Sequence, residues 1–123
     1  MFKKILFSLG ISLALSFVGC GASGIGSCSY SEGGSVTQCA DYGDGWTPTD
    51  AQANCNKPPA GSYSSGGCPA ENRVGRCVVT VGAFGVTQSS TINFYPPTTA
   101  SSAMSQCGLL NTGAGTTSTF TAN

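Results

Sequence analysis

Cysteines are the residues with the clearest chemistry in this 123-residue sequence, which contains seven of them. No two cysteines have the C-x-x-C spacing of zinc sites and dithiol redox motifs. The chain contains no histidine, so it lacks the base of Ser-His and Cys-His catalytic groups and the commonest metal ligand. We therefore expect disulfide chemistry, with no enzymatic activity, metal or cofactor. The six cysteines expected to pair are Cys28, Cys39, Cys55, Cys68, Cys77 and Cys107.

The segment DYGDGWTP, residues 41–48, is the best candidate for ligand contact. Tyr42 and Trp46 are aromatic rings beside the carboxylates of Asp41 and Asp44, a composition that suits a platform on which a sugar stacks. The two carboxylates do not have the EF-hand spacing for calcium. Nothing in the sequence marks them as the acid and base pair of a glycosidase.

A structural interpretation of the same segment competes with ligand binding. Thr47 is a suitable N-cap, Pro48 suits the first helical position, and Asp50 completes a capping-box pattern. Trp46 would then pack against Ala51 as a hydrophobic staple, and the two glycines of the segment would only turn the chain.

The sequence patterns that predict strands and helices around these cysteines occur twice in the chain. Val-Thr-Gln stands at 36–38 and at 86–88, eight or nine residues after a cysteine, and an Ala-x-x-x-Cys sequence ends at Cys55 and at Cys107. Two repeat units, about 28–72 and 73–123, are therefore predicted.

Each unit has the local pattern of two strands, a short helix and a weak third strand. Strands are predicted at 77–81 and 91–95, around a glycine-containing turn, and the first unit has its turn at 31–34. A helix capped by Thr47 or Thr99 follows, and the weak strands are 61–64 and 117–121. The predicted fold class is α+β, a small disulfide-stapled domain built from two β-β-α-β repeats.

The repeat also ranks the fifteen possible disulfide connectivities. Alignment of the two units places Cys39 opposite Ile92 and Cys68 opposite Phe120, so both unmatched cysteines have large apolar counterparts. This favours Cys39–Cys68, with Cys28–Cys55 and Cys77–Cys107 as equivalent bridges between first strand and helix. Pairing of Cys28 with Cys39 across the first hairpin is the alternative.

Residues 1–19 have the sequence pattern of an export signal. Lys3 and Lys4 precede an apolar run at 5–18 that is too short to span a bilayer. The sequence Phe17-Val18-Gly19-Cys20 resembles the processing site of bacterial lipoproteins, although that family usually has Leu in place of Phe17. The resemblance implies a signal peptide at 1–19, acylation of Cys20, and a lipidated N-terminus with a flexible tether at 20–27. Cleavage after Ala22 by an ordinary signal peptidase is the alternative, and it would discard Cys20.

The remaining chain, 28–123, loosely resembles small cysteine-rich bacterial lipoproteins of unassigned role, on its cysteine spacing and the segment CPAENRVGRC at 68–77. After the two N-terminal lysines, the chain has three basic and five acidic residues. It has no basic stripe that would suggest nucleic acid as a partner.

We therefore expect a membrane-anchored, non-enzymatic module of the bacterial cell envelope, on the periplasmic or surface face of the outer membrane. Its role would be structural or the binding of a macromolecule, with a glycan or a protein as ligand. The alternatives are a carbohydrate-binding module that uses Trp46 and Tyr42, and an enzyme inhibitor that presents a disulfide-braced loop at 57–67.

Overall fold

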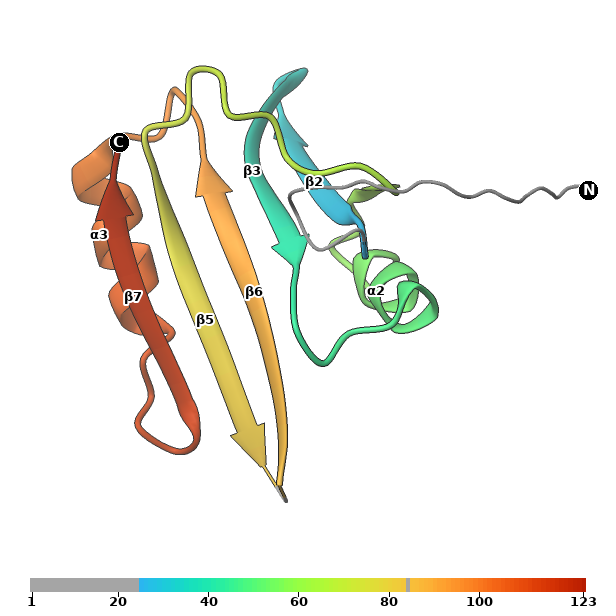
Figure 1. Ribbon diagram of the computed structural model, residues 1–123. Helices are drawn as coiled ribbons and strands as arrows, with labels where there is room; N and C mark the ends of the chain where they lie inside the picture. The colour runs from blue at the N-terminus through green and yellow to red at the C-terminus, as the bar shows by residue number, and fades with distance from the viewer. Residues whose placement is uncertain (1–24, 84) are drawn as a thin grey trace, which may run out of the picture.

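The computed structural model describes residues 25–83 and 85–123, which form one six-stranded sheet and two helices (Figure 1). The prediction of an α+β domain with disulfides is confirmed. In chain order the elements are β2 (Ser27–Glu32), β3 (Ser35–Tyr42), α2 (Pro48–Cys55), β4 (Ser62–Ser64), β5 (Gly75–Ala83), β6 (Val86–Phe94), α3 (Ala100–Leu109) and β7 (Thr116–Ala122).

The sheet has the strand order β4-β2-β3-β6-β5-β7, and each of its five strand pairs is antiparallel. The hairpins β2–β3 and β5–β6 meet along β3 and β6, and β4 and β7 form the two edges. Gly33 and Gly34, both at positive φ, turn the first hairpin where the sequence predicted it. The second hairpin is longer than predicted.

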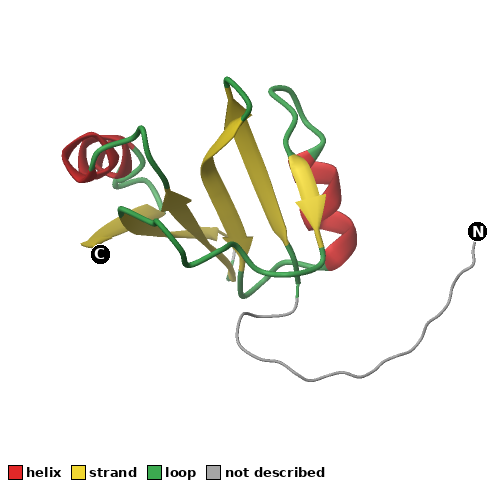
Figure 2. Cartoon of the chain, turned by 90° about the horizontal axis from the view of Figure 1, so that it is seen from above, coloured by secondary structure: helices red, strands yellow, loops and turns green. Residues whose placement is uncertain are grey.

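Both helices begin at the predicted caps. The Thr47 side chain accepts a hydrogen bond from the Asp50 backbone N–H, and Thr99 does the same for Ser102, each at 3.1 Å. These bonds satisfy N–H groups that have no partner within the helix. Helix α2 contacts β2 and β4, whereas α3 contacts β5 and β7, so the helices lie at opposite ends of the sheet (Figure 2).

The cross-strand register shows that the two helices cover the same face. One row of directly paired residues crosses all six strands, and partners in such a row point to one face. The row is Tyr63, Cys28, Ala40, Ile92, Cys77 and Phe120. Cys28 and Cys77 each bond to a helix cysteine, so this is the helix face of the sheet.

The three disulfides are Cys28–Cys55, Cys39–Cys68 and Cys77–Cys107, the pairs that the repeat favoured. Five of these cysteines are among the most buried residues of the described chain. Two apolar clusters form around them. Cys28 and Cys55 lie with Tyr42 and Ala51 under α2, and Cys77 and Cys107 lie with Phe94 and Ala103 under α3.

The alignment behind the Cys39–Cys68 prediction was wrong by one residue. Cys28 pairs with Ala40 and Cys77 pairs with Ile92, so Ile92 corresponds to Ala40, and the counterpart of Cys39 is Thr91. Ile92 therefore lies on the helix face, whereas Cys39 points to the opposite face, because neighbouring residues of a strand alternate.

The second half of that alignment was wrong as well. Phe120 pairs with Cys77 as Tyr63 pairs with Cys28, so Tyr63 and not Cys68 is the counterpart of Phe120. The bridge was identified correctly for a reason that the register does not support.

Candidate binding groove

A groove of about 650 Å³ lies on the helix face between α2 and the middle of the sheet. Its floor is formed by side chains of β2, β3 and β6, and its wall by α2 and the loop at 57–60. The groove is open because each helix packs over outer strands, which leaves the central pair β3 and β6 between them. Its lining includes the side chains of Tyr30, Gln38, Ala40, Trp46, Asn54 and Ser90.

Tyr42 and Trp46, two of the predicted contact residues, line one corner of this groove. The Tyr42 side chain is 2% exposed, and its hydroxyl donates to Asn54 Oδ1 at 2.9 Å. The Trp46 ring meets the Tyr42 ring edge to face, with 4.8 Å between centroids. Tyr42 is therefore a buried support, and the half-buried Trp46 is the more exposed ring of the pair at this corner.

Burial changes the acid–base behaviour of this corner. Desolvation, with smaller contributions from Tyr30 and Tyr63, raises the pKa of Tyr42 to about 12. Trp46 Nε1 is buried and has no hydrogen-bond partner within the described chain. An indole N–H without an acceptor is uncommon in a folded interior, and it gives this corner one unused donor.

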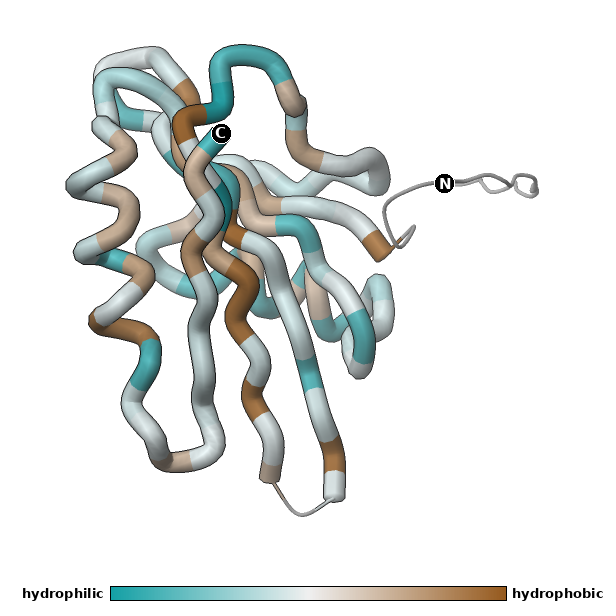
Figure 3. Tube along the Cα trace, turned by 60° about the vertical axis from the view of Figure 1, so that its left-hand side comes forward, coloured by the Kyte–Doolittle hydropathy of each residue, from teal (hydrophilic) through white to brown (hydrophobic). Residues whose placement is uncertain are grey.

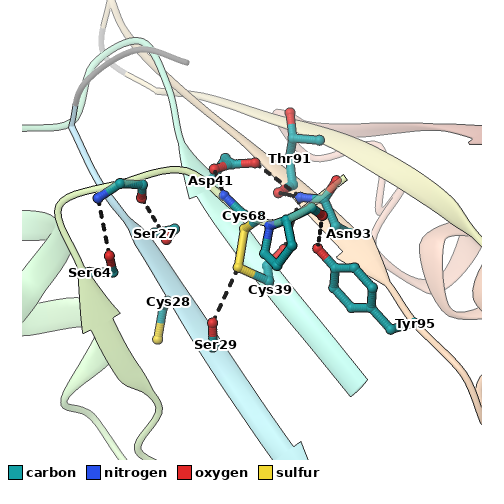
Figure 4. Close-up of a disulfide and its surroundings, with 12 residues drawn as sticks. Ser27, Cys28, Ser29, Cys39, Asp41, Ser64, Cys68, Thr91, Asn93 and Tyr95 are labelled. Atoms are coloured by element: carbon teal, nitrogen blue, oxygen red, sulfur yellow. Dashed lines mark hydrogen bonds between the residues drawn. A yellow bond between two sulfur atoms is a disulfide. The ribbon is translucent and has the colours of Figure 1, made fainter. Parts of the chain in front are cut away.

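Asp41, the third predicted residue, lies on the opposite face of the sheet and does not line the groove. Its carboxylate accepts from the Cys68 backbone N–H at 2.8 Å and from Asn93 Nδ2 at 3.1 Å (Figure 4). Asn93 is 1% exposed and also donates to the Cys39 carbonyl oxygen, while Arg73 donates to its Oδ1 at 3.0 Å. These bonds attach the segment that links the two hairpins, which includes Cys68 and Arg73, to strands β3 and β6.

Asp44, the fourth predicted residue, is exposed in the loop between β3 and α2. Its backbone bonds to Ser89: the Asp44 carbonyl accepts from Ser89 N at 2.9 Å, and Asp44 N donates to Ser89 Oγ at 3.1 Å. Gly43 N donates to the Ser89 carbonyl oxygen at 2.9 Å. The loop therefore runs along β6, a contact that the sequence did not predict.

The polar part of the groove comes from residues that sequence reasoning missed. Gln38 projects from β3 and donates to Gln106 of α3 at 3.0 Å, and Ser90 and Asn54 add a hydroxyl and an amide. Glu32 and Lys57 place one charge of each sign in the lining. Gln38, Ala40 and Tyr42 alternate along β3, and this period of two was the signal available in the sequence.

The loop proposed as an inhibitory tip, 57–67, consists of two structural parts. Residues 57–60 are exposed and form part of the groove wall, whereas Ser62–Ser64 pair with β2. The Tyr63 hydroxyl donates to the Ile25 carbonyl oxygen at 2.6 Å, and burial raises the pKa of Tyr63.

The predicted signal peptide at 1–19 and the acylation site at Cys20 lie outside the described residues. Ser27, the last residue of the predicted tether, already belongs to β2, and Tyr42 N donates to the Gly26 carbonyl oxygen. No helix in the described part of the chain is long and apolar enough to cross a membrane.

Comparison with protein-family models, curated proteins and solved structures finds no match for this chain.

Proposed function

We propose that this chain is a lipid-anchored, non-enzymatic protein of the bacterial envelope whose domain binds a macromolecular ligand in the central groove. The groove is the observation that carries the proposal. It combines an aromatic corner at Trp46, an apolar floor at Ala40 and hydrogen-bonding groups at Gln38, Asn54 and Ser90. Concave sites with a few convergent polar groups are typical of ligand binding.

The anchor and the export route are supported by the sequence and the bridges together. The basic start, the apolar run and the lipoprotein-like Cys20 predict acylation and a membrane partner. Three disulfides suit an oxidising compartment outside the cytosol. Two or more acyl chains would hold the protein stably on a membrane, whereas one gives marginal binding.

Mass spectrometry of the protein from its native membranes tests the anchor. We expect the N-terminal peptide to begin at Cys20 and to carry the mass of two or three acyl chains. An unmodified N-terminus at Ser23 would instead indicate ordinary cleavage after Ala22, and it would overturn the anchor while leaving the groove proposal intact.

Carbohydrate is the ligand class that a specific observation favours. Trp46 and Tyr30 bring aromatic rings to the groove, and its lining also includes two amide side chains and a serine hydroxyl. Rings supply apolar faces on which sugars stack, and amides match their hydroxyl groups. Tyr42 is too deeply buried to stack on a sugar, so Trp46 is the ring of the predicted pair that would contact one.

The only tryptophan provides the measurement, because Trp46 borders the groove. Titration with cell-wall and host glycans should change its fluorescence. Ala40→Met, which fills the floor, should abolish that change, and Ala53→Met on the exposed side of α2 is the matched control. If no glycan alters the fluorescence, carbohydrate binding fails. If protein ligands bind equally to both variants, binding in the groove fails.

We also infer that the domain consists of two repeats, about 28–72 and 73–123. The order strand, strand, helix, strand occurs in each. Cys28–Cys55 and Cys77–Cys107 join equivalent elements. The pairing of β3 with β6 is symmetric about Ala40 and Ile92, as expected for two equivalent units related by a twofold axis.

A further inference from the structure

Strand β7 forms a long edge of the sheet with unused hydrogen-bonding groups. Gly82 N donates to the Gly115 carbonyl and Asn123 N to the Val74 carbonyl, so odd-numbered residues of this strand bond to β5. Antiparallel pairs alternate between bonded and non-bonded residues. The backbone groups of Ser118, Phe120 and Ala122 therefore point away from the sheet.

This edge carries none of the features with which proteins protect edges. Such features are charged side chains, proline, bulges and very short strands. Strand β7 has seven residues, TTSTFTA, without charge or proline, and it pairs with β5 in unbroken register. The opposite edge, β4, has only three residues.

Helix α3 extends this surface next to β7 (Figure 1). Gln106 reaches Gln38 in β3, so that side of the helix faces the middle of the sheet. Met104 lies about 160° around the helix from Gln106, which is the flank toward the β7 edge, and it is 56% exposed. Ser101 and Gly108 are on the same flank, where small residues would let another helix approach closely.

No side chain after Arg76 is charged. Residues 77–123 contain no Asp, Glu, Lys or Arg, and α3 is mostly pale on the hydropathy scale (Figure 3). A charged edge would repel an identical edge, whereas this one meets a copy of itself without like-charge contacts. An antiparallel edge is also complementary to itself about a twofold axis.

We propose that two copies of this chain associate through β7, with α3 of each copy alongside, and form a continuous twelve-stranded sheet. A twofold axis at Phe120 pairs each Phe120 with the partner's Phe120. Ser118 then pairs with the partner's Ala122, and every outward backbone group between these residues gains a bond. Thr119 lies opposite the partner's Thr121. The proposal does not depend on the groove or on the anchor.

Sedimentation equilibrium of the full chain, with Cys20→Ser to prevent acylation, tests this pairing from about 1 µM to 1 mM. We expect a monomer–dimer equilibrium. Thr119→Lys with Thr121→Lys places like charges opposite each other and should weaken association at least about tenfold. Thr119→Lys with Thr121→Glu places opposite charges there and should restore it. Thr121 also pairs with Arg76 within the chain, so the thermal stability of both double variants is measured beside their association.

Two single substitutions test whether helix α3 also takes part in the association. Met104→Lys should also weaken the dimer, while Gln52→Lys, at the equivalent position of α2, should not. Circular dichroism would establish that each variant is folded. A wild type that stays monomeric throughout the concentration range overturns the proposal. A dimer that neither the double-lysine variant nor Met104→Lys weakens also overturns it.

Discussion

Residue-scale roles in this protein depend on which face of the sheet a side chain occupies. Asp41 and Tyr42 are neighbours in the sequence, yet Asp41 joins the polar network around Asn93 and Tyr42 joins the apolar cluster under α2. The sequence grouped them as one ligand-binding segment. Composition can identify such residues, but only the register assigns them to faces, and a shift of one residue exchanges the faces.

Titration of Tyr42 should make the domain less stable in alkali. Its pKa is about 12 in the folded protein and near 10 when exposed, because the buried phenol resists ionisation. The unfolded chain loses its proton first, so the contribution of Tyr42 to stability is complete below pH 10 and is lost as the pH rises toward 12. Denaturant unfolding at several pH values measures this loss.

Tyr42→Phe isolates the phenol from the other tyrosines. Loss of the bond to Asn54 should lower the free energy of unfolding by about 1 kcal/mol at pH 7. The further decline between pH 10 and 12 should be smaller than in the wild type. An unchanged alkaline decline would show that Tyr42 does not titrate in this range.

The DYGDGWTP loop requires a glycine at position 45. Its φ is +83°, and a Cβ there would collide with the Thr87 carbonyl oxygen, which is backbone of β6. Gly113 has a similar φ of +76° but open space around it. Gly113→Ala should therefore cost about 1 kcal/mol of backbone strain, whereas Gly45→Ala should cost clearly more. Equal thermal shifts for the two variants would contradict this.

At the scale of elements, local signals predicted the helices well. The caps at Thr47 and Thr99 and the turn at Gly33-Gly34 follow from residues near one another in the sequence. Strand β5 was predicted at 77–81 and extends over Gly75–Ala83. Its additional residues have weak strand propensity, and pairing with β6 holds them in the sheet.

The Cys77–Cys107 bridge should hold α3 on the sheet. Replacing both cysteines with serine removes the cross-link and exchanges two buried sulfurs for hydroxyls, so we expect a loss of about 2–5 kcal/mol. The equivalent change at Cys39 and Cys68 leaves both helix bridges in place. The Cys39 and Cys68 double variant should therefore lose less of the far-ultraviolet helical signal than the Cys77 and Cys107 double variant, although its stability also falls. Equal loss of helix in the two variants would contradict this assignment.

The whole-molecule arrangement could not be derived from the sequence in the same way. Each unit could be outlined, but the junction of the hairpins along β3 and β6 depends on contacts more than fifty residues apart, such as Asn93 with Cys39. The groove follows from that junction, because it lies where the two helices leave the central strands open. Ser90 and Gln38 therefore had no visible role before the fold was known.

The interior of the domain is rich in disulfide sulfur and poor in large side chains. Half of the ten buried apolar residues in the described chain are cysteines of the three bridges, and two more are alanines. Few large side chains remain to stabilise the fold by burial alone, so cross-links must contribute a large share of a total near 5–15 kcal/mol.

Reduction should therefore unfold the domain at neutral pH and room temperature, with loss of near-ultraviolet circular dichroism. In the absence of reductant, the six paired cysteines should resist alkylation even in strong denaturant. A reduced protein that keeps its thermal transition within a few degrees would show that apolar packing suffices and would contradict the importance given to the bridges. Partial reduction should release the half-buried Cys68 bridge first, because Cys28, Cys55, Cys77 and Cys107 are at most 2% exposed and a thiolate must reach the sulfur that it attacks.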